Sequence, residues 1–357
     1  MTVNDKELKN VYIIDNNGVK RRIKRIYIGV NGKANKIADT ITTVDRLYKT
    51  ITSLSQARRY LAATSIGDYA LFGGGYDYSS SYSDVVDAYD TSLVRTTPTP
   101  LSGARYRPAA TSIGNYALFG GGNGAKSDIV DAYDTSLVRT TPTPLSRART
   151  NLAATSIGNY ALFGGGVSSS VVDAYDTSLL RTTPTPLSQA RYDLAATSIG
   201  DYALFGGGQS ESNLSVVDTY NTSLVRTTPT SLSKARHDLA ATSIGDYALF
   251  GGGSSPTVVD AYDTSLVRTT PTPLSQSMTD VSATSIGNYA LFCGNYSSSY
   301  AVNAYDTSLL RTTHTPLSQA RYDLAATSIG DYALFGGGQA SGAFDVVDAY
   351  SVQNILI

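Results

Sequence analysis

The sequence of 357 residues predicts an all-β fold, a seven-bladed β-propeller with four-stranded blades. The first observation is a repeat: the stretch Tyr69–Gly75, Tyr-Ala-Leu-Phe-Gly-Gly-Gly, occurs almost unchanged in seven copies, with its tyrosine at positions 69, 116, 160, 202, 247, 289 and 332. The second is periodicity, because no repeat carries an apolar stripe of helical period and each carries short runs typical of strands. The third is length, since intervals of 42 to 47 residues suit one blade each.

Each repeat is expected to form four strands, which we name a to d from the propeller axis outward. In the copy at residues 189–229, we place strand a at Leu194–Ile199, b at Tyr202–Gly206, c at Val216–Tyr220 and d at Leu224–Thr230. Strand a consists of small residues, which fit where blades converge, and strand b is apolar, as expected for a strand covered on both faces. Strand d carries Pro-x-Pro in most copies, and proline belongs on an exposed edge because it cannot donate to a ladder.

The ends of the repeat region predict how the ring closes. Six copies of an Arg-Thr-Thr strand d serve seven copies of strands a to c, so the last blade needs an outer strand from elsewhere. We expect it from the N-terminal side, at about residues 47–55; the alternative is residues 351–357. The predicted domains are a basic, β-rich attachment segment at 1–42, with a small β-hairpin signalled by its Asn-Gly pairs, and the propeller at 43–357.

Charge separates the same two regions. The chain has 28 Lys and Arg against 29 Asp and Glu, a formal net charge of −1, which predicts no general attraction to nucleic acid or to anionic membranes. Residues 1–38 hold nine Lys and Arg against three acids, net +6, which leaves net −7 for the remainder. The N-terminus lacks the apolar core of a signal peptide and no run approaches 18 apolar residues, so we expect synthesis in the cytoplasm without a signal and no membrane insertion.

The residue inventory argues against an enzyme. One cysteine, Cys293, and two histidines, His237 and His314, provide no intrachain disulfide, no cysteine-based metal site and no catalytic triad, so we expect no catalytic residue, metal or cofactor. The glycine triplets end a strand without opening a helix, unlike phosphate-binding loops. A repeated strand-c Asp, absent only in blade six, favours a structural hydrogen bond over calcium. The Arg before each strand a is either a structural fork or a basic rim for anionic polymers; both interpretations stay open, and the residues are Arg58, Arg105, Arg149, Arg191, Arg236 and Arg321.

Comparison of the seven copies divides the propeller into two faces. Subtracting the b–c loop from each repeat interval leaves 38 residues every time, so all length variation lies in that loop. The junction between strand d and the next strand a also varies, whereas the a–b and c–d turns are nearly identical between blades. In a propeller the b–c and d–a connections open on one face, here called the diversified face, and the two turns on the other, the uniform face. Binding residues are expected on variable loops of a rigid scaffold.

The diversified loops are rich in Tyr, Ser, Asn and Gly, the composition of adaptable binding loops. Tyrosine faces can stack on sugar rings while neighbouring Ser and Asn bond their hydroxyls. The candidate ligand-binding residues are Tyr76, Tyr78, Tyr82, Arg59, Tyr106, Arg107, Tyr192, His237, Tyr296, Tyr300 and Tyr322.

Two resemblances add to these expectations. Over about residues 44–350, the diglycine after strand b and the Tyr of strand c resemble the kelch repeat, although the kelch tryptophan is missing. Residues Ile23–Ala34 resemble a short module of tail-associated proteins from phages and prophages of Gram-positive bacteria. This implies a component of the phage tail in the virion, a possible homo-oligomer, that contacts tail or baseplate proteins through residues 1–42 and a host cell-surface glycan or protein through the diversified face.

Two other functions remain as alternatives. One is a kelch-type sugar-active enzyme, an oxidase or epimerase, for which the sequence offers the row Asp193, Asp238, Asp280 and Asp323. The other is a structural scaffold propeller.

Overall fold

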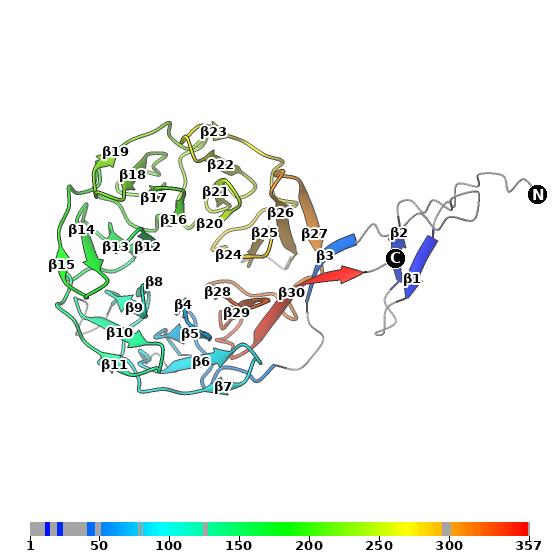
Figure 1. Ribbon diagram of the computed structural model, residues 1–357, viewed down its shortest axis with the longest axis horizontal. Helices are drawn as coiled ribbons and strands as arrows, with labels where there is room; N and C mark the ends of the chain where they lie inside the picture. Colours follow the sequence, from blue (N-terminus) through cyan, green and yellow to red (C-terminus); the bar gives the residue numbers. More distant parts are fainter. Residues whose placement is uncertain are drawn as a thin grey trace, which may run out of the picture. The chain divides into compact units, whose positions relative to one another are not determined.

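The computed structural model describes residues 11–14, 20–23, 41–46, 51–77, 79, 81–123, 128–294 and 301–355. Seven antiparallel sheets of four strands stand around a central axis, and the described residues include no helix (Figure 1). The prediction of an all-β, seven-bladed propeller is confirmed. No helix in this part of the chain is long and apolar enough to cross a membrane.

The chain divides into two compact units, residues 1–43 with 353–357, and residues 44–352. In the first unit, β1 (Val11–Ile14) pairs antiparallel with β2 (Lys20–Ile23), from Val11 opposite Ile23 to Ile14 opposite Lys20. This is the expected N-terminal hairpin.

The innermost strands, at position a, are β4 (Ala62–Ile66), β8 (Ala109–Ile113), β12 (Ala153–Ile157), β16 (Ala195–Ile199), β20 (Ala240–Ile244), β24 (Ser282–Ile286) and β28 (Ala325–Ile329). Position b holds β5 (Tyr69–Gly73), β9 (Tyr116–Gly120), β13 (Tyr160–Gly164), β17 (Tyr202–Gly206), β21 (Tyr247–Gly251), β25 (Tyr289–Cys293) and β29 (Tyr332–Gly336). Position c holds β6 (Val86–Asp90), β10 (Val130–Asp134), β14 (Val172–Asp176), β18 (Val217–Asn221), β22 (Val259–Asp263), β26 (Val302–Asp306) and β30 (Val347–Ile355). Position d holds β7 (Arg95–Thr96), β11 (Arg139–Thr140), β15 (Arg181–Thr182), β19 (Arg226–Thr227), β23 (Arg268–Thr269), β27 (Arg311–His314) and β3 (Ile41–Arg46).

Most strands d are shorter than expected. In blade four the predicted range Leu224–Thr230 reduces to the two residues of β19. Leu224 has a φ of 59° and belongs to the c–d turn, while Pro229 lacks the N–H that would extend the ladder. Blade six supports this reason, because His314 stands where other blades have proline and β27 there runs for four residues.

The last blade is closed from the N-terminal side, as expected, but its outer strand is β3, which lies upstream of the predicted residues 47–55. Of those residues, 51–55 form no strand and 47–50 lie outside the described residues. The Thr52 carbonyl accepts a hydrogen bond from the Tyr89 hydroxyl, as the Thr99 carbonyl does from Tyr133. Residues 51–55 are therefore equivalent to the segment after strand d in other blades. The alternative of residues 351–357 as outer strand is wrong for 351–355, which continue strand c in β30.

Blade-to-blade packing builds the core. The Leu and Phe of each strand b are fully buried, and each Phe meets the strand-c Tyr of its own blade edge to face, with ring centroids 5.7–6.0 Å apart. The Phe ring also lies against the strand-b glycine of the preceding blade, as Phe163 does at Gly120. Blade six has Cys293 at that glycine position, fully buried, and burial raises the pKa of its thiol well above the usual value.

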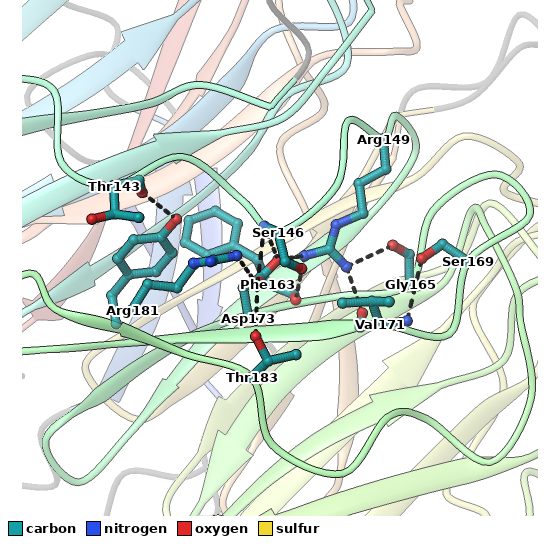
Figure 2. A network of polar contacts seen from close by, with 11 residues as sticks. Thr143, Ser146, Arg149, Phe163, Gly165, Ser169, Val171, Asp173, Arg181 and Thr183 are labelled. Atoms are coloured by element: carbon teal, nitrogen blue, oxygen red, sulfur yellow. Dashed lines mark hydrogen bonds and ion pairs between the residues drawn. The ribbon is translucent and has the colours of Figure 1, made fainter.

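The repeated arginine before strand a is structural. In blade three, Arg149 donates from Nη2 to the carbonyl of Phe163 at 3.1 Å and forms an ion pair with Asp173, which also accepts from Arg181 Nη1 at 3.1 Å and from the Ser146 N–H (Figure 2). The same Arg–Asp–Arg arrangement occurs in blades one to five. Because the arginines that precede strand a are at most 4% exposed, the basic-rim interpretation is wrong, and the strand-c Asp is the structural hydrogen-bonding group.

Candidate functional site

The two variable segments form one surface. In blades one, two, four and seven, the residue that begins the b–c loop pairs with the d–a junction of its own blade, through bridges between Arg59 and Tyr76, Tyr106 and Asn123, Tyr192 and Gln209, and Tyr322 and Gln339. In blades three and five, the N–H groups of Val167 and Ser254 donate to the carbonyls of Thr150 and His237 at 3.0 and 2.9 Å. This confirms that the b–c loops and d–a junctions share the diversified face.

Four tyrosines gather where blades one and two meet on this face. Tyr82 lies 5.8 Å from Tyr76 and 5.0 Å from Tyr106 between ring centroids, and Tyr106 lies 6.0 Å from Tyr60. Tyr82 is 42% exposed, and the other three are half-buried. We call Tyr60, Tyr76, Tyr82 and Tyr106 the tyrosine patch.

Two arginines contact the rings of the patch. The Arg59 guanidinium carbon lies 5.1 Å from the Tyr76 ring centroid and 5.3 Å from that of Tyr60, and Arg59 donates to the Gln339 side chain of the last blade. The Arg107 guanidinium carbon lies 4.3 Å from the Tyr60 centroid. Because the two arginines already contact aromatic faces and acceptors, they hold the tyrosine rings in place.

A cavity of about 220 Å³, here called the central pocket, opens beside the patch. Its polar lining comes from the second residue after each recurring Arg, or after Met278 in blade six. These seven d–a residues all have left-handed backbone, with φ between 51° and 59°, and they are Tyr60, Arg107, Asn151, Asp193, Asp238, Asp280 and Asp323. Leucines, Pro108, Val281 and Ser282 complete the lining.

Backbone hydrogen bonds connect these d–a residues from blade to blade. The Tyr60 N–H donates to the Asp323 carbonyl across the closure of the ring at 3.0 Å, and the Arg107 N–H donates to the Tyr60 carbonyl at 2.8 Å. The Asp238 N–H likewise donates to the Asp193 carbonyl at 3.0 Å. The side chains therefore stand at fixed positions around the pocket.

The pocket is acidic on one side. Asp193 pairs with Arg107 at 3.4 Å and accepts from the Asn151 amide, and Asp323 accepts from Gln339 Nε2 at 2.6 Å. Asp238 contacts His237 at 3.3 Å, whereas Asp280 makes no hydrogen bond or ion pair with the described part of the chain. The charges are thus unevenly distributed around the opening.

Burial and like charge shift these carboxyl groups. Burial first, and then the neighbouring Asp193 and Asp280, raise the pKa of Asp238 to about 7. Burial and Asp280 raise the pKa of Asp323 to about 6, and burial raises that of Asp280. Among the described residues, no group of three or more His, Cys, Asp or Glu side chains is arranged to hold a metal ion.

The predicted site residues fall into three groups. Arg59, Tyr76, Tyr82, Tyr106 and Arg107 are brought together at the tyrosine patch. Tyr192, His237 and Tyr322 lie on the same face at other blades, where His237 Nδ1 is 2.8 Å from Asn213 Oδ1. Tyr78, Tyr296 and Tyr300 lie outside the described residues.

Sequence reasoning left Tyr60 out of the site, although it joins the patch to the pocket. The repeat alignment could have indicated Tyr60 as a site residue, because Tyr60 occupies the repeat position that is Asp in four other blades.

Comparison with known proteins establishes the fold alone. No protein-family model matches this chain, and no curated protein matches it either. A solved structure titled "Structure of YjhT" superimposes with a TM-score of 0.55 over 86% of this chain and 100% of that chain, at 13% sequence identity. The chain is similar to that protein in its propeller architecture.

Proposed function

We propose that this chain is a non-enzymatic binding protein, a kelch-like propeller of a phage tail that recognises a glycan or protein on the host cell surface through its diversified face. The observation that carries the proposal is the tyrosine patch, in which each ring, from one b–c loop or two d–a junctions, lies 5.0–6.0 Å from at least one other ring. Exposed aromatic surface in a fixed arrangement is typical of binding sites, because it contributes contact area at low entropic cost.

The contrast between the faces supports the same proposal. The a–b and c–d turns are as exposed as the variable loops, yet they repeat almost identically from blade to blade. General drift of surface residues would alter both faces. Variation confined to the connections that surround the patch and pocket is expected if that face contacts a ligand.

The N-terminal segment supplies the attachment in this proposal. Its net charge of +6 over residues 1–38, opposite in sign to the remainder, suits contact with a different partner, and the resemblance of residues Ile23–Ala34 points to tail or baseplate proteins. Detection of the chain in purified phage particles by mass spectrometry tests this part. Its absence from the tail fraction would refute the placement in the virion.

Binding to a glycan array and to Gram-positive cells, with the fluorescently labelled full chain, tests the recognition. The double variant Tyr82→Ala/Tyr106→Ala should lose at least 10-fold in affinity, because it removes two of the four stacking faces. The matched control is Val138→Ala, which truncates a side chain that is 57% exposed on the uniform face and should bind like the parent. Equal binding by the parent and the double variant would refute the assignment.

One observation favours a second function, a sugar-active enzyme. Asp238 and Asp323, with pKa values raised to about 7 and about 6, lie at a pocket, where groups of this kind serve as general acids or bases. Proton NMR of hexoses and hexosamines incubated with the chain would show turnover as new anomeric signals. Conversion that disappears in Asp238→Asn would replace the binding proposal by the enzyme.

A further inference from the structure

We propose that the central pocket receives a single saccharide residue that is uncharged or carries an amino group, with the amino-bearing residue preferred, and that it rejects anionic sugars. This deepens the proposed function and rests on it, since it specifies the chemical class that the diversified face recognises. Four steps support it: the size of the pocket, its charges, its continuity with the tyrosine patch, and the state of its carboxyl groups.

The size of the pocket limits the ligand to one small group. Its volume of about 220 Å³ lies below the roughly 300–1,000 Å³ of pockets that enclose drug-sized molecules. The lining combines apolar side chains, with Leu61, Leu194 and Leu324 among them, and the polar side chains of the d–a residues. A pyranose ring has matching features, because its C–H faces are apolar and its hydroxyl groups point outward.

The charges decide which saccharide fits. Carboxylates only accept hydrogen bonds, so Asp238, Asp280 and Asp323 require hydroxyl or ammonium donors. The one guanidinium of the lining, Arg107, pairs with Asp193 and only partly offsets the other carboxyl groups, whose pKa values stay raised. An incoming carboxylate or phosphate would meet like charges, which is unfavourable in a half-buried site.

The tyrosine patch is an independent observation that points to an extended saccharide. Tyr60 belongs both to the patch, 6.0 Å from Tyr106, and to the lining of the pocket. When one sugar of an oligosaccharide stacks on the patch, the next sugar of the same oligosaccharide is therefore close to the pocket. Sugar stacking on aromatic faces combined with acceptors at the ring edge is a common recognition arrangement.

The carboxyl groups carry charge that a cationic group would stabilise. Burial and like charge raise the pKa of Asp238 to about 7 and that of Asp323 to about 6, and burial raises the pKa of Asp280, so each of these groups becomes charged only at a higher pH than an ordinary aspartate. The other ionisable groups that face them are Asp193, Arg107, Tyr60 and His237. An amino sugar should consequently bind more tightly at pH 7.5 than at pH 5.0, whereas glucose should change much less.

Isothermal titration calorimetry with the full chain tests the proposal with three probes: glucosamine, glucose and glucuronic acid. At pH 7.5 we expect glucosamine to bind at least 10-fold more tightly than glucuronic acid, with glucose between them. Asp280→Asn should weaken glucosamine binding at least fivefold, while the matched acid-to-amide control Asp201→Asn, in an exposed a–b turn, should bind like the parent. Unchanged circular dichroism and Tm would show that both variants are folded.

Equal or tighter binding of glucuronic acid, or an Asp280→Asn variant that binds glucosamine like the parent, would overturn the inference. The result is separable from that for the proposed function. If Tyr82→Ala/Tyr106→Ala loses cell binding but the parent binds the three sugars equally, only the inference about the pocket is refuted. If the parent discriminates among the three sugars but binds neither cells nor the glycan array, only the proposed function is refuted.

Discussion

The buried Arg–Asp contacts allow a quantitative prediction, because blade six presents the same site without the buried ion pair. In blade four, Arg191 and Asp218 are fully buried, with Arg191 Nη1 2.7 Å from Asp218 Oδ2, and Asp218 Oδ1 also accepts from Arg226 Nη1 at 2.8 Å. In blade six the equivalent residues are Met278 and Asn303, also fully buried, with the amide of Asn303 3.3 Å from the Met278 sulfur. The Asn303 Oδ1 still accepts from Arg311 Nη1 at 3.2 Å, so the protein already contains a version of the site without the buried ion pair.

Asp218→Asn alone should lower the free energy of unfolding by about 3–5 kcal/mol, because it leaves the Arg191 guanidinium buried without its counter-charge. Burial already lowers the pKa of Arg191, and Asp218 is the main group that opposes this shift. Adding Arg191→Met removes the unpaired charge and reproduces blade six. We expect this double variant to lie within about 1.5 kcal/mol of the parent, because buried ion pairs are often replaced by neutral residues at little cost.

Thermal and urea unfolding, followed by near-ultraviolet circular dichroism of the tyrosines, measures both variants. If the propeller unfolds as one unit, the single substitution should lower Tm by roughly 6–20 °C and the second substitution should restore most of that loss. A double variant as unstable as Asp218→Asn would refute the reasoning. An Asp218→Asn variant as stable as the parent would refute it equally.

Three other predictions concern backbone, pH and ring closure. Gly207→Ala should cost about 1–3 kcal/mol in urea unfolding, because its φ is +66° and a Cβ would lie 2.7 Å from the Arg236 carbonyl oxygen; Ser210→Ala, in the neighbouring exposed loop, should have no effect. Asp238→Asn should stabilise the protein at pH 8 by on the order of 1 kcal/mol after solvent screening. This gain should shrink as the pH falls through about 7, since the raised pKa means that the folded state prefers the protonated group, and a pH-independent difference in unfolding free energy would contradict the assignment. Deletion of residues 1–46 removes β3 and should lower Tm and speed proteolysis within Val347–Ile355; an unchanged cleavage rate there would show that β3 does not close the ring.

The sequence was sufficient for the number of blades and for the division into two faces. Each copy of Tyr-Ala-Leu-Phe-Gly encodes its own buried strand, and the constant spacing of strands within a repeat places every turn on a defined face. Strand d was predicted less well, because its length depends on which N–H groups remain available. Leu224 in a left-handed turn and Pro229 beyond it leave only Arg226–Thr227 to pair.

The site was less predictable because it depends on contacts between blades. The sequence allowed both interpretations of Arg149, and only its burial and its bond to the Phe163 carbonyl decide that it is structural. The central pocket required closure of the ring, which brings Asp323 of the last blade against Tyr60 of the first. The repeat places these two residues and Arg107 at equivalent positions of their blades, but only the closed ring shows that they line one cavity.

Hydrogen exchange of the full chain, with and without the glycan that binds most tightly on the array, tests the central claim most directly. We predict slower exchange at the d–a junctions and b–c loops around the tyrosine patch, in residues 59–61, 76–83 and 106–108. The a–b and c–d turns of the uniform face should exchange at the same rate in both states. Protection confined to those turns, with none around Tyr82 and Tyr106, would contradict the claim that the diversified face binds the ligand.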